Sequence, residues 1–474
     1  MGTSEQQKPA LMASVSGLRG TVGGSLTPDV VVRYVGAFAG WVSETTGAAR
    51  PTIVLGRDGR AGGQLIRDLV VSSLRAGGCD VMDLGVVTTP TVGLMVGELR
   101  ADGGLVVTAS HNPAEWNGLK PITAEGRAPS PADAGVLLER FRNGLARVVG
   151  HDRYGDERRD GTAVDRHVDR VLTALEKIGV AEKARGARFK VVVDSVNCSG
   201  ARVMARLLEA LNCKVTHLNK SVDGVFPHMP EPTAEHLTDL CEKVGAAKAD
   251  IGLAQDPDAD RLAIIDGSGR YIGEEYTLAL SAMSLLGSMG GRAKGARLAA
   301  NLSTSRMIDD VASEYGARVV RTAVGEANVV MGMRDYGCVL GGEGNGGVVW
   351  ADVVSIRDSV GAAGLVLGLM ARTGRSVREL VDAIPAYAMV KRKVVLKPGL
   401  AERAIERVND AFPDAERDTQ DGLRVDFESP SGGGSAWLHV RASNTEPILR
   451  LIVEAPTRAD SDAIIEDAQH SIGG

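Results

Sequence analysis

The sequence predicts an α/β fold of three related α/β domains with mixed, mainly parallel sheets, followed by a smaller C-terminal α+β domain. Its 474 residues are too many for one hydrophobic core, because single cores stop growing at about 250–300 residues. A strand, a loop of small residues, a helix and a second strand recur three times, which is typical of parallel sheets flanked by helices. After residue 385 the pattern changes to short strand runs.

The three copies of this pattern span residues 52–82, 190–215 and 297–320. In the first copy TIVL is the first strand, Gln64–Arg75 is the helix and CDVM is the second strand. All three copies place Gly or Asn between the helix and the second strand, as a helix C-terminus favours. Three unrelated βαβ units are the alternative, and this shared feature favours related domains.

Two segments are predicted to separate domains. Gly150–Thr162 is charged, contains glycine and lacks apolar periodicity, so we expect a linker there. The last long helix is expected to stop near Ile384–Pro385, and strand runs follow between residues 390 and 440. The predicted domains therefore span residues 1–160, 161–274, 275–385 and 386–474.

The composition, with 44% hydrophobic and 24% charged residues, describes a soluble globular protein. A net charge of −6 argues against nucleic-acid binding. The five cysteines form no CxxC pair and leave an odd one over, which indicates reduced thiols in a cytoplasmic protein. We predict small-molecule partners and no nucleic acid, with the chain as a monomer or a homodimer.

Neither export nor membrane association is predicted. The N-terminal residues MGTSEQQKPALM lack the basic and then apolar order of a signal peptide. The longest apolar stretch, Tyr276–Met289, is shorter than the roughly 20 residues that a membrane helix requires. We expect it to form a buried helix.

The first chemical motif is LVVTASHNPAEWNGLK at Leu105–Lys120. Its apolar strand is cut off by small and hydrogen-bonding residues, and Pro113 fixes the turn that follows. Ser110 stands on this turn beside His111 and is a candidate nucleophile or phosphate carrier. An ordinary polar turn is the alternative.

The second motif, DPDADR, places Asp256, Asp258 and Asp260 on a tight loop between apolar strand runs. Alternating carboxylates that converge on one point select a hard cation such as Mg²⁺. An EF-hand is excluded because Arg261 and Gly267 stand where its Gly and Glu belong. A haloacid-dehalogenase loop is disfavoured because Asp260 replaces its Thr or Val. A solvated acidic hairpin is the structural alternative.

The third motif, GGEGNGG at residues 341–347, follows the strand run Cys338–Leu340. It differs from the GxGxxG fingerprint in order and no helix starts directly after it, so dinucleotide binding is not expected. The glycines enclose Glu343 and Asn345, whose carboxylate and amide suit adjacent sugar hydroxyls. A flexible turn is the alternative.

The fourth motif is RASNTEPILR at residues 441–450. Arg441, Ser443, Asn444, Thr445 and the backbone N–H groups of the turn supply donors that suit an oxyanion. Arginine can hold a phosphate through two hydrogen bonds. A helix-capping turn is the alternative.

Together the four motifs resemble the alpha-D-phosphohexomutase family in order and spacing, over essentially the whole chain. Shorter matches support the resemblance: SGLRG at residues 16–20, GRD at 56–58, NGLK at 117–120 and TAVGE at 322–326. The resemblance implies four domains around a central cleft, with a phosphate-binding fourth domain.

The resemblance also implies a mechanism. In the family the serine of the first motif is phosphorylated, so Ser110 would carry the phosphoryl group. One Mg²⁺ per active site would bind the phosphoserine oxygen and the three aspartates, and would offset charge during transfer. Lys120 would be the general base or acid, with Arg19 and His111 close to the reacting phosphoryl group. A hexose bisphosphate would be the intermediate and activator.

Substrate contacts follow in the same way. The non-reacting phosphate of the sugar would bind to the fourth motif and to Arg450. The sugar ring would bind to Glu343 and Asn345, and Arg261 and Gly325 are further expected substrate contacts.

One departure from the family concerns residues 345–347. Several members have Ser-Gly-His after the loop glutamate, whereas this chain has Asn-Gly-Gly. A histidine is therefore absent there, and we expect Lys120 to take a larger part in the chemistry.

The resemblance implies a phosphohexomutase that interconverts hexose 6-phosphates and hexose 1-phosphates. The phosphate and sugar loops look closest to phosphoglucosamine mutases, with a phosphomannomutase/phosphoglucomutase as the alternative. No residue is identified that reads the C2 substituent, so weak discrimination at C2 is expected. A sugar-phosphate sensor and a phosphatase are further hypotheses, and the intact Ser110, Lys120 and aspartates favour the mutase.

Overall fold

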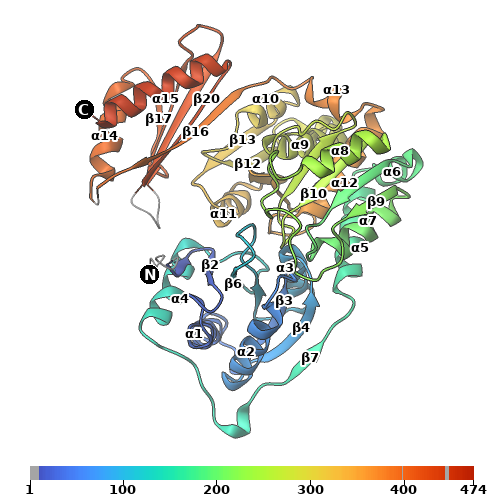
Figure 1. The fold of residues 1–474 in the computed structure, drawn as a ribbon, viewed down its shortest axis with the longest axis vertical. Helices are drawn as coiled ribbons and strands as arrows, with labels where there is room; N and C mark the ends of the chain where they lie inside the picture. The colour runs from blue at the N-terminus through green and yellow to red at the C-terminus, as the bar shows by residue number, and fades with distance from the viewer. Residues whose placement is uncertain (1–9, 398, 443–447, 474) are drawn as a thin grey trace, which may run out of the picture.

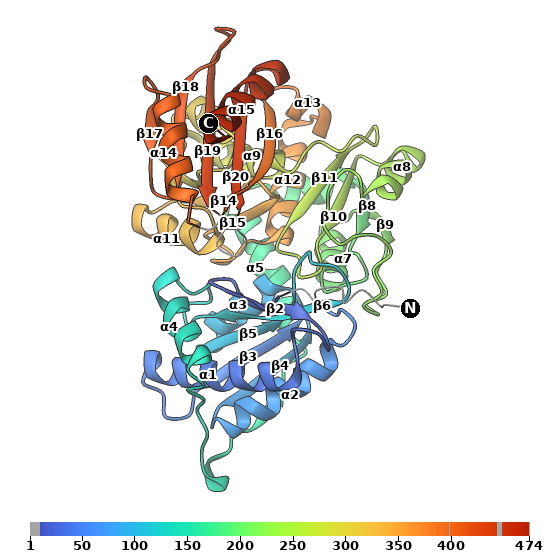
Figure 2. The same ribbon diagram turned by 60° about the vertical axis from the view of Figure 1, so that its left-hand side comes forward.

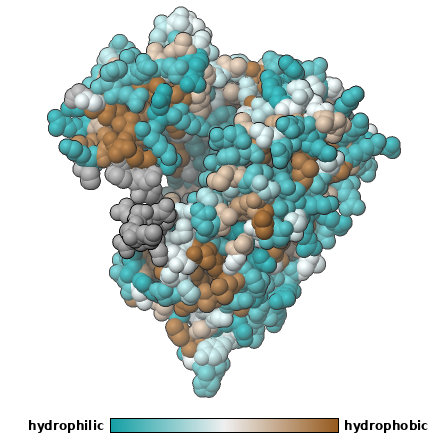
Figure 3. Space-filling model, viewed as in Figure 1, coloured by the Kyte–Doolittle hydropathy of each residue, from teal (hydrophilic) through white to brown (hydrophobic). Residues whose placement is uncertain are grey.

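The computed structural model describes residues 10–397, 399–442 and 448–473. Four units follow one another along the chain, and each is built on its own sheet. In Figures 1 and 2 the first unit lies at the bottom, and the fourth forms a lobe at the upper left that is reached through β16 (Ala388–Val395). Figure 3 shows the surface hollowed between this lobe and the rest of the molecule.

The first unit has a seven-stranded mixed sheet with helices on both faces. Its strands, in spatial order, are β1 (Met12–Ser14), β2 (Gly17–Thr21), β6 (Trp116–Ile122), β5 (Gly103–Val107), β3 (Thr52–Arg57), β4 (Asp80–Val86) and β7 (Glu157–Arg159). Its helices are α1 (Pro28–Thr46), α2 (Gly63–Ala76), α3 (Thr89–Leu99) and α4 (Pro131–Arg142). Parallel pairs join β5, β3, β4 and β7, whereas the pairs from β5 through β6 and β2 to β1 are antiparallel. This sheet is less parallel than predicted, because the N-terminal hairpin extends its antiparallel edge.

The second and third units repeat the central part of the first. The second contains β8 (Lys190–Asp194), α7 (Gly200–Ala210), β9 (Lys214–Leu218), α8 (Thr238–Ala247), β10 (Ile251–Gln255) and β11 (Leu262–Asp266). The third contains β12 (Arg297–Asn301), α10 (Met307–Glu314), β13 (Arg318–Thr322), α11 (Glu326–Tyr336), β14 (Leu340–Glu343) and β15 (Gly347–Trp350). The orders β11-β10-β8-β9 and β15-β14-β12-β13 match β6-β5-β3-β4 of the first sheet. The prediction of three related α/β units is confirmed.

This shared topology places three motifs at equivalent positions. In each unit the third parallel strand turns through a hairpin into an antiparallel strand, as β5–β6, β10–β11 and β14–β15 show. The connecting loops are residues 108–115, 256–261 and 344–346, which hold the serine, the aspartates and part of the glycine-rich motif. Equivalent loops of similar units can therefore meet at one place.

A shared apolar core joins the first three units. In β3, Val54 faces α3, whereas Ile53 and Leu55 face α1 and α2, so the strand is buried on both faces. The cluster around α3 continues through the helices between the sheets, which are α5 (Ala163–Lys177), α6 (Ala181–Ala187), α9 (Glu275–Met289), α12 (Ser359–Thr373) and α13 (Val377–Val381). The predicted buried helix at 276–289 is confirmed as α9. No helix among the described residues is long and apolar enough to cross a membrane.

The fourth unit is a five-stranded antiparallel sheet with helices on one face. Its strands, in spatial order, are β16, β20 (Ile448–Ala455), β19 (Ser435–Ala442), β18 (Leu423–Glu428) and β17 (Glu416–Asp418), and its helices are α14 (Ala401–Ala411) and α15 (Arg458–Gly473). The other face contacts the third unit: Nδ1 of His439 lies 2.8 Å from Oγ of Ser303, and Arg424 donates a 2.6 Å hydrogen bond to the carbonyl of Leu302.

Two local predictions differ from the structure. The expected linker at 150–162 contains strand β7, which pairs with β4. The residues of β7 are charged, and Glu157 forms an ion pair with Arg67, so the strand has no apolar periodicity by which the sequence could reveal it. The third motif does not begin as a loop, because β14 runs on to Glu343. A Cβ at Gly342 would lie 2.3 Å from the carbonyl oxygen of Gly347, so glycine permits the close hairpin. All five cysteines are free, as expected.

Candidate active site

Ser110 lies in a strained turn, three residues after the end of β5 at Val107. Its φ of 50° is in the left-handed region, and the residue is 2% exposed. The Oγ donates a 2.8 Å hydrogen bond to Oδ2 of Asp256 and lies 3.3 Å from Nδ1 of His111. The hydroxyl of Thr108 accepts the N–H of Ser110 at 2.8 Å. The first two motifs therefore meet at the Ser110 hydroxyl.

Arg60, which the sequence analysis did not single out, holds this turn from behind. Its guanidinium and Asp58 form a 3.0 Å ion pair with no exposed side-chain surface, and it lies 5.0 Å from the ring of Phe226 in the second unit. The same guanidinium donates hydrogen bonds to four backbone carbonyls, those of Ser110, Asn112 (3.1 Å), Pro113 (2.9 Å) and Trp116 (2.7 Å). Arg60 thus fixes the backbone on which Ser110 stands.

The aspartates of the second motif are fully buried, which excludes a solvated acidic hairpin. Asp256, Asp258 and Asp260 are each 0% exposed, and one carboxylate oxygen of each lies within 4.8 Å of the others. Oδ1 of Asp258 and Oδ1 of Asp260 accept no hydrogen bond from any described residue. Three carboxylates that converge, with two of their oxygens left without a partner among the described residues, fit a hard divalent cation.

The charge balance of this cluster is uneven. Burial, together with repulsion by Asp260 and Asp258, raises the pKa of Asp256 well above its usual value. Burial acts in the same direction on Asp260, but Arg357, Lys120 and further positive charge outweigh it and hold the pKa of Asp260 well below its usual value. Three adjacent buried carboxylates cannot all be charged at low cost, so a cation would stabilise the cluster.

Lys120 reaches the cluster from the neighbouring strand. Because β5 and β6 pair antiparallel, Lys120 lies opposite Val106, just before the serine turn. Its Nζ lies 2.8 Å from Oδ2 of Asp260 and 3.3 Å from Oδ2 of Asp258. Burial lowers the pKa of Lys120, but the two carboxylates outweigh this effect and raise it, so its ammonium is charged.

Arg19, His111 and Arg261 surround the serine turn. Arg19 donates a 3.0 Å hydrogen bond to Oδ1 of Asn112, and the backbone N–H of Arg261 donates one of 3.1 Å to Oδ1 of Asp256. Burial, reinforced by the two arginines, lowers the pKa of His111 to about 3. The imidazole is therefore neutral near neutral pH.

Glu343 of the third motif is joined to the aspartate cluster through Arg357. Arg357 forms ion pairs with Asp260 at 2.6 Å, with Glu326 at 2.8 Å and with Glu343. Sequence analysis did not identify Arg357, because a single arginine before the N-terminus of a helix carries no specific signal. The structure thus brings the second and third motifs together.

The remaining predicted sugar contacts lie around Glu343. Its Oε1 accepts a 2.8 Å hydrogen bond from Asn301 and one of 3.2 Å from the N–H of Gly325. Nδ2 of Asn345 lies 3.5 Å from Oε2, so Asn345 is close to the carboxylate. The amide and the carboxylate are therefore neighbours, as two groups that bind adjacent hydroxyls must be.

Positive charge gathers on the face of the fourth sheet that carries no helices. Arg441 in β19 lies opposite Arg450 in β20, which lies opposite Lys393 in β16. Directly opposite residues share a face, and like charges in that position are destabilising. Asp421 lies 3.3 Å from Arg441 and offsets part of the charge. This row suits an anionic ligand, and Lys393 is an addition to the predicted residues; Ser443, Asn444 and Thr445 lie outside the described residues.

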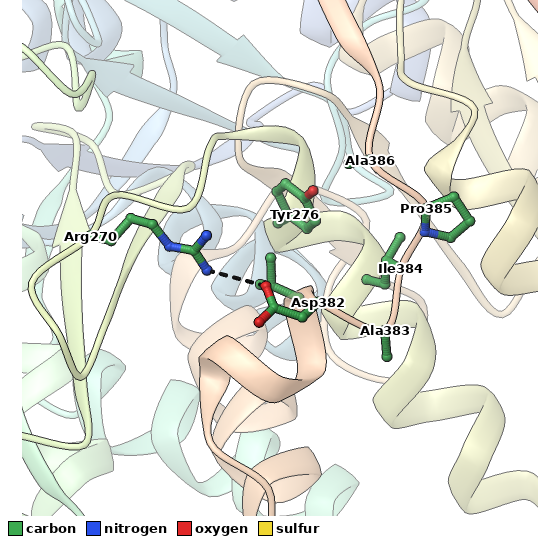
Figure 4. A pocket seen from close by; sticks show the side chains of 8 residues that line it. Arg270, Tyr276, Asp382, Ala383, Ile384, Pro385 and Ala386 are labelled. Atoms are coloured by element: carbon green, nitrogen blue, oxygen red, sulfur yellow. Dashed lines mark ion pairs between the residues drawn. The ribbon is translucent and has the colours of Figure 1, made fainter. Parts of the chain in front are cut away.

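A separate pocket lies where the third unit leads into the fourth (Figure 4). It is lined by Arg270, Tyr276 and the segment 381–386, and Arg270 forms a 3.7 Å ion pair with Asp382 across it. No predicted site residue lines this pocket, and it contains no group of metal-ligating side chains. The hairpin loops, and not this pocket, form the candidate active site.

Comparison with known proteins agrees with this arrangement. Sequence models described as phosphoglucomutase/phosphomannomutase match the chain in order: alpha/beta/alpha domain I at residues 12–147, domain II at 165–269, domain III at 274–387 and the C-terminal domain at 389–470.

Individual relatives match over nearly the full length. A protein of Methanopyrus kandleri named "Probable phosphoglucosamine mutase" is 38% identical over 445 residues, which are 93% of this chain and 93% of that protein. A Thermococcus kodakarensis protein named "Phosphoglucomutase/phosphomannomutase" is 34% identical over 461 residues, 95% of this chain and 96% of that one. The crystal structure of a phosphoglucomutase/phosphomannomutase family protein from Burkholderia thailandensis has a TM-score of 0.81 at 27% identity and covers 97% of this chain and 98% of that chain. The chain belongs to the phosphoglucomutase/phosphomannomutase family.

Proposed function

We propose that this protein is a phosphohexomutase that interconverts hexose 6-phosphates and hexose 1-phosphates, with glucosamine phosphates as main substrates. One observation carries the proposal: the Ser110 hydroxyl donates a 2.8 Å hydrogen bond into a buried cluster of carboxylates that also binds Lys120. A nucleophile, a metal site and a positive group in one cluster suit phosphoryl transfer. A binding protein has no need of the nucleophile and the metal ligands together.

In the proposed reaction, phosphorylated Ser110 is the donor. The bond from its Oγ to phosphorus breaks, and a new ester forms on the free hydroxyl of a bound hexose phosphate. The resulting hexose bisphosphate turns end for end, and its other phosphoryl group returns to Ser110. A magnesium ion held by the phosphoserine oxygen and by Asp256, Asp258 and Asp260 would offset the charge of the phosphoryl group.

The chain's own groups move the proton and hold the substrate. We assign Lys120 as the general acid or base, because it can exchange a proton and its Nζ lies in the carboxylate cluster, 2.8 Å from Asp260. Neutral His111 is 3.3 Å from the Ser110 hydroxyl and, with Arg19, is assigned to the reacting phosphoryl group. We assign the second phosphate to Arg441, Ser443, Asn444, Thr445 and Arg450, and we add Lys393, which lies opposite Arg450.

A substrate panel tests this proposal. Phosphorylated protein is given glucosamine, mannose and glucose phosphates, and the three kcat/KM values are measured side by side. We expect glucosamine phosphates to be the best substrates, with measurable turnover of the others. An inert glucosamine compound beside good turnover of mannose or glucose phosphate would favour a phosphomannomutase/phosphoglucomutase. Release of free phosphate at the rate of isomerisation would favour a phosphatase, and binding without turnover a sensor.

A further inference from the structure

Glu326 is a buried carboxylate that the proposed mechanism does not use. It is the first residue of α11 and is 9% exposed. Neither of its carboxylate oxygens accepts a hydrogen bond from a described residue. We infer that Glu326 forms a cation subsite for the ammonium group of an amino sugar phosphate, an inference that rests on the proposed mutase function.

Glu326 lies beside the group assigned to the sugar ring. The N–H of Gly325, the residue before it, donates a 3.2 Å hydrogen bond to Oε1 of Glu343. Both glutamates also face one guanidinium: Nε of Arg357 lies 2.8 Å from Oε2 of Glu326, and its Nη1 donates to Oε2 of Glu343. Both carboxylates therefore contact one guanidinium, and Glu326 lies beside the group that we assign to the sugar ring.

The positive charge around Glu326 does not match the negative charge. Arg357 forms ion pairs with Glu326, with Glu343 and with Asp260. Lys120 forms ion pairs with Asp258 and Asp260. Even when a divalent cation and Lys120 together balance the three aspartates, Glu326 and Glu343 share the one guanidinium charge of Arg357. The contact between Arg357 and Glu326 is not aligned as a hydrogen bond, since Nε and Oε2 both remain without a hydrogen-bond partner among the described residues.

A buried carboxylate in this state is costly, and a cationic ligand relieves the cost. Burial raises the pKa of Glu326, with Arg357 and Lys120 opposing the shift, which agrees with an incompletely compensated charge. A protonated amine brings one positive charge and three N–H donors. A sugar hydroxyl brings one donor and no charge, and an N-acetyl group is neutral. The subsite therefore favours amino sugar phosphates over both.

This subsite changes the expectation for the group at C2. Sequence analysis identifies no residue that contacts that substituent, and it therefore predicts weak discrimination between sugars that differ at C2. With Glu326 as a cation subsite, the protein separates charged amines from neutral groups. It still discriminates weakly between glucose and mannose phosphates, which differ only in the orientation of a hydroxyl.

Binding measurements on a Ser110→Ala background, which prevents turnover, test the inference. Calorimetry compares glucosamine 6-phosphate, glucose 6-phosphate and N-acetylglucosamine 6-phosphate in that protein and after the further change Glu326→Gln. We expect Glu326→Gln to reduce the preference for glucosamine 6-phosphate over glucose 6-phosphate by at least about tenfold. Glu326→Asp, which keeps the charge, should retain most of the preference. Glu314→Gln, the same change at an exposed position on α10, should leave it unaltered.

Several results would overturn the inference. An unchanged preference in Glu326→Gln, or an equal loss of affinity for both sugars, would show that Glu326 is structural. Equal affinities in the protein with Glu326 intact would exclude the subsite even if no variant folded. The proposed function fails separately, if the wild-type protein isomerises no hexose phosphate. The binding preference is measurable in either case, so the two failures are distinguishable.

Discussion

Oγ of Ser110 donates a 2.8 Å hydrogen bond to Oδ2 of Asp256, which is 146 residues further along the chain. The bond joins the hairpin loop of the first unit to the equivalent loop of the second. Arg357 then joins Asp260, in that second loop, to Glu343 at the end of β14 in the third unit. The three related units therefore contribute to one cluster, in which a nucleophile, carboxylates and positive groups lie in contact.

Loss of one aspartate should remove metal-dependent activity. Asp258→Asn leaves the cluster with two carboxylates, so we expect activity to fall about tenfold to a hundredfold. Excess magnesium should restore only part of this activity, because one of the three ligands is missing. Activity is measured as a function of magnesium concentration. Asp239→Asn, on the exposed surface of α8, serves as the control. Full activity of the wild-type protein in a chelator would show that the loop is not a metal site.

Arg60 should act on turnover more than on substrate binding. Arg60→Lys keeps the charge but cannot reach four carbonyls, so the serine turn loses its fixed position. We expect kcat to fall on the order of tenfold to a hundredfold while KM changes little. Arg50→Lys, at a half-exposed arginine that forms surface ion pairs, is the matched control. A rise in KM with an unaltered kcat would contradict a positioning role.

The cation row of the fourth sheet should bind the phosphate that does not react. Lys393→Ala removes one member and should raise KM about threefold to tenfold, equivalent to roughly 0.7–1.4 kcal/mol. Arg392→Ala changes the preceding residue of β16, whose side chain leaves the strand on the opposite face. Steady-state kinetics of both variants make the comparison. Equal effects of the two changes would show that net charge, and not the row, matters.

Glu275 should make stability depend on pH. Burial raises the pKa of Glu275 from 4.5 to about 8, so the folded protein keeps a proton there that the unfolded chain has lost. Stability should therefore fall as pH rises between these values. Melting temperatures of the wild type and of Glu275→Gln are compared across this range, with Glu314→Gln as the control. Parallel curves for all three proteins would contradict the assignment.

Sequence analysis identifies site residues where a polar turn interrupts an otherwise regular strand. Ser110 and the aspartates follow apolar strands that end in polar turns, and such breaks are visible without a structure. The recurring strand and helix pattern predicts three related units, which the sheets confirm. The repetition does not show that the equivalent loops meet, because that depends on how the three units pack; the structure shows it through the bond from Ser110 to Asp256.

Residues that act through distant contacts could not be found in this way. Arg60, Arg357 and Lys393 stand in segments that look like ordinary loops or strands. Their partners are backbone carbonyls, carboxylates of other units and cations on neighbouring strands. Glu326 belongs to the motif TAVGE, but its missing partners become visible only once burial and hydrogen bonds are known. Tertiary packing creates these roles.

Transfer of a phosphoryl group through Ser110 is the central claim, and it can be followed directly. Dephosphorylated protein is incubated with a labelled hexose bisphosphate, and peptide mass spectrometry locates the label. Unlabelled glucosamine 6-phosphate is then added, and the label in the sugar products is measured against time. We predict that the label enters at Ser110 and passes to the sugar as fast as turnover, and that Ser110→Ala takes up none and is inactive. Label on another residue, or wild-type turnover by Ser110→Ala, would contradict the account.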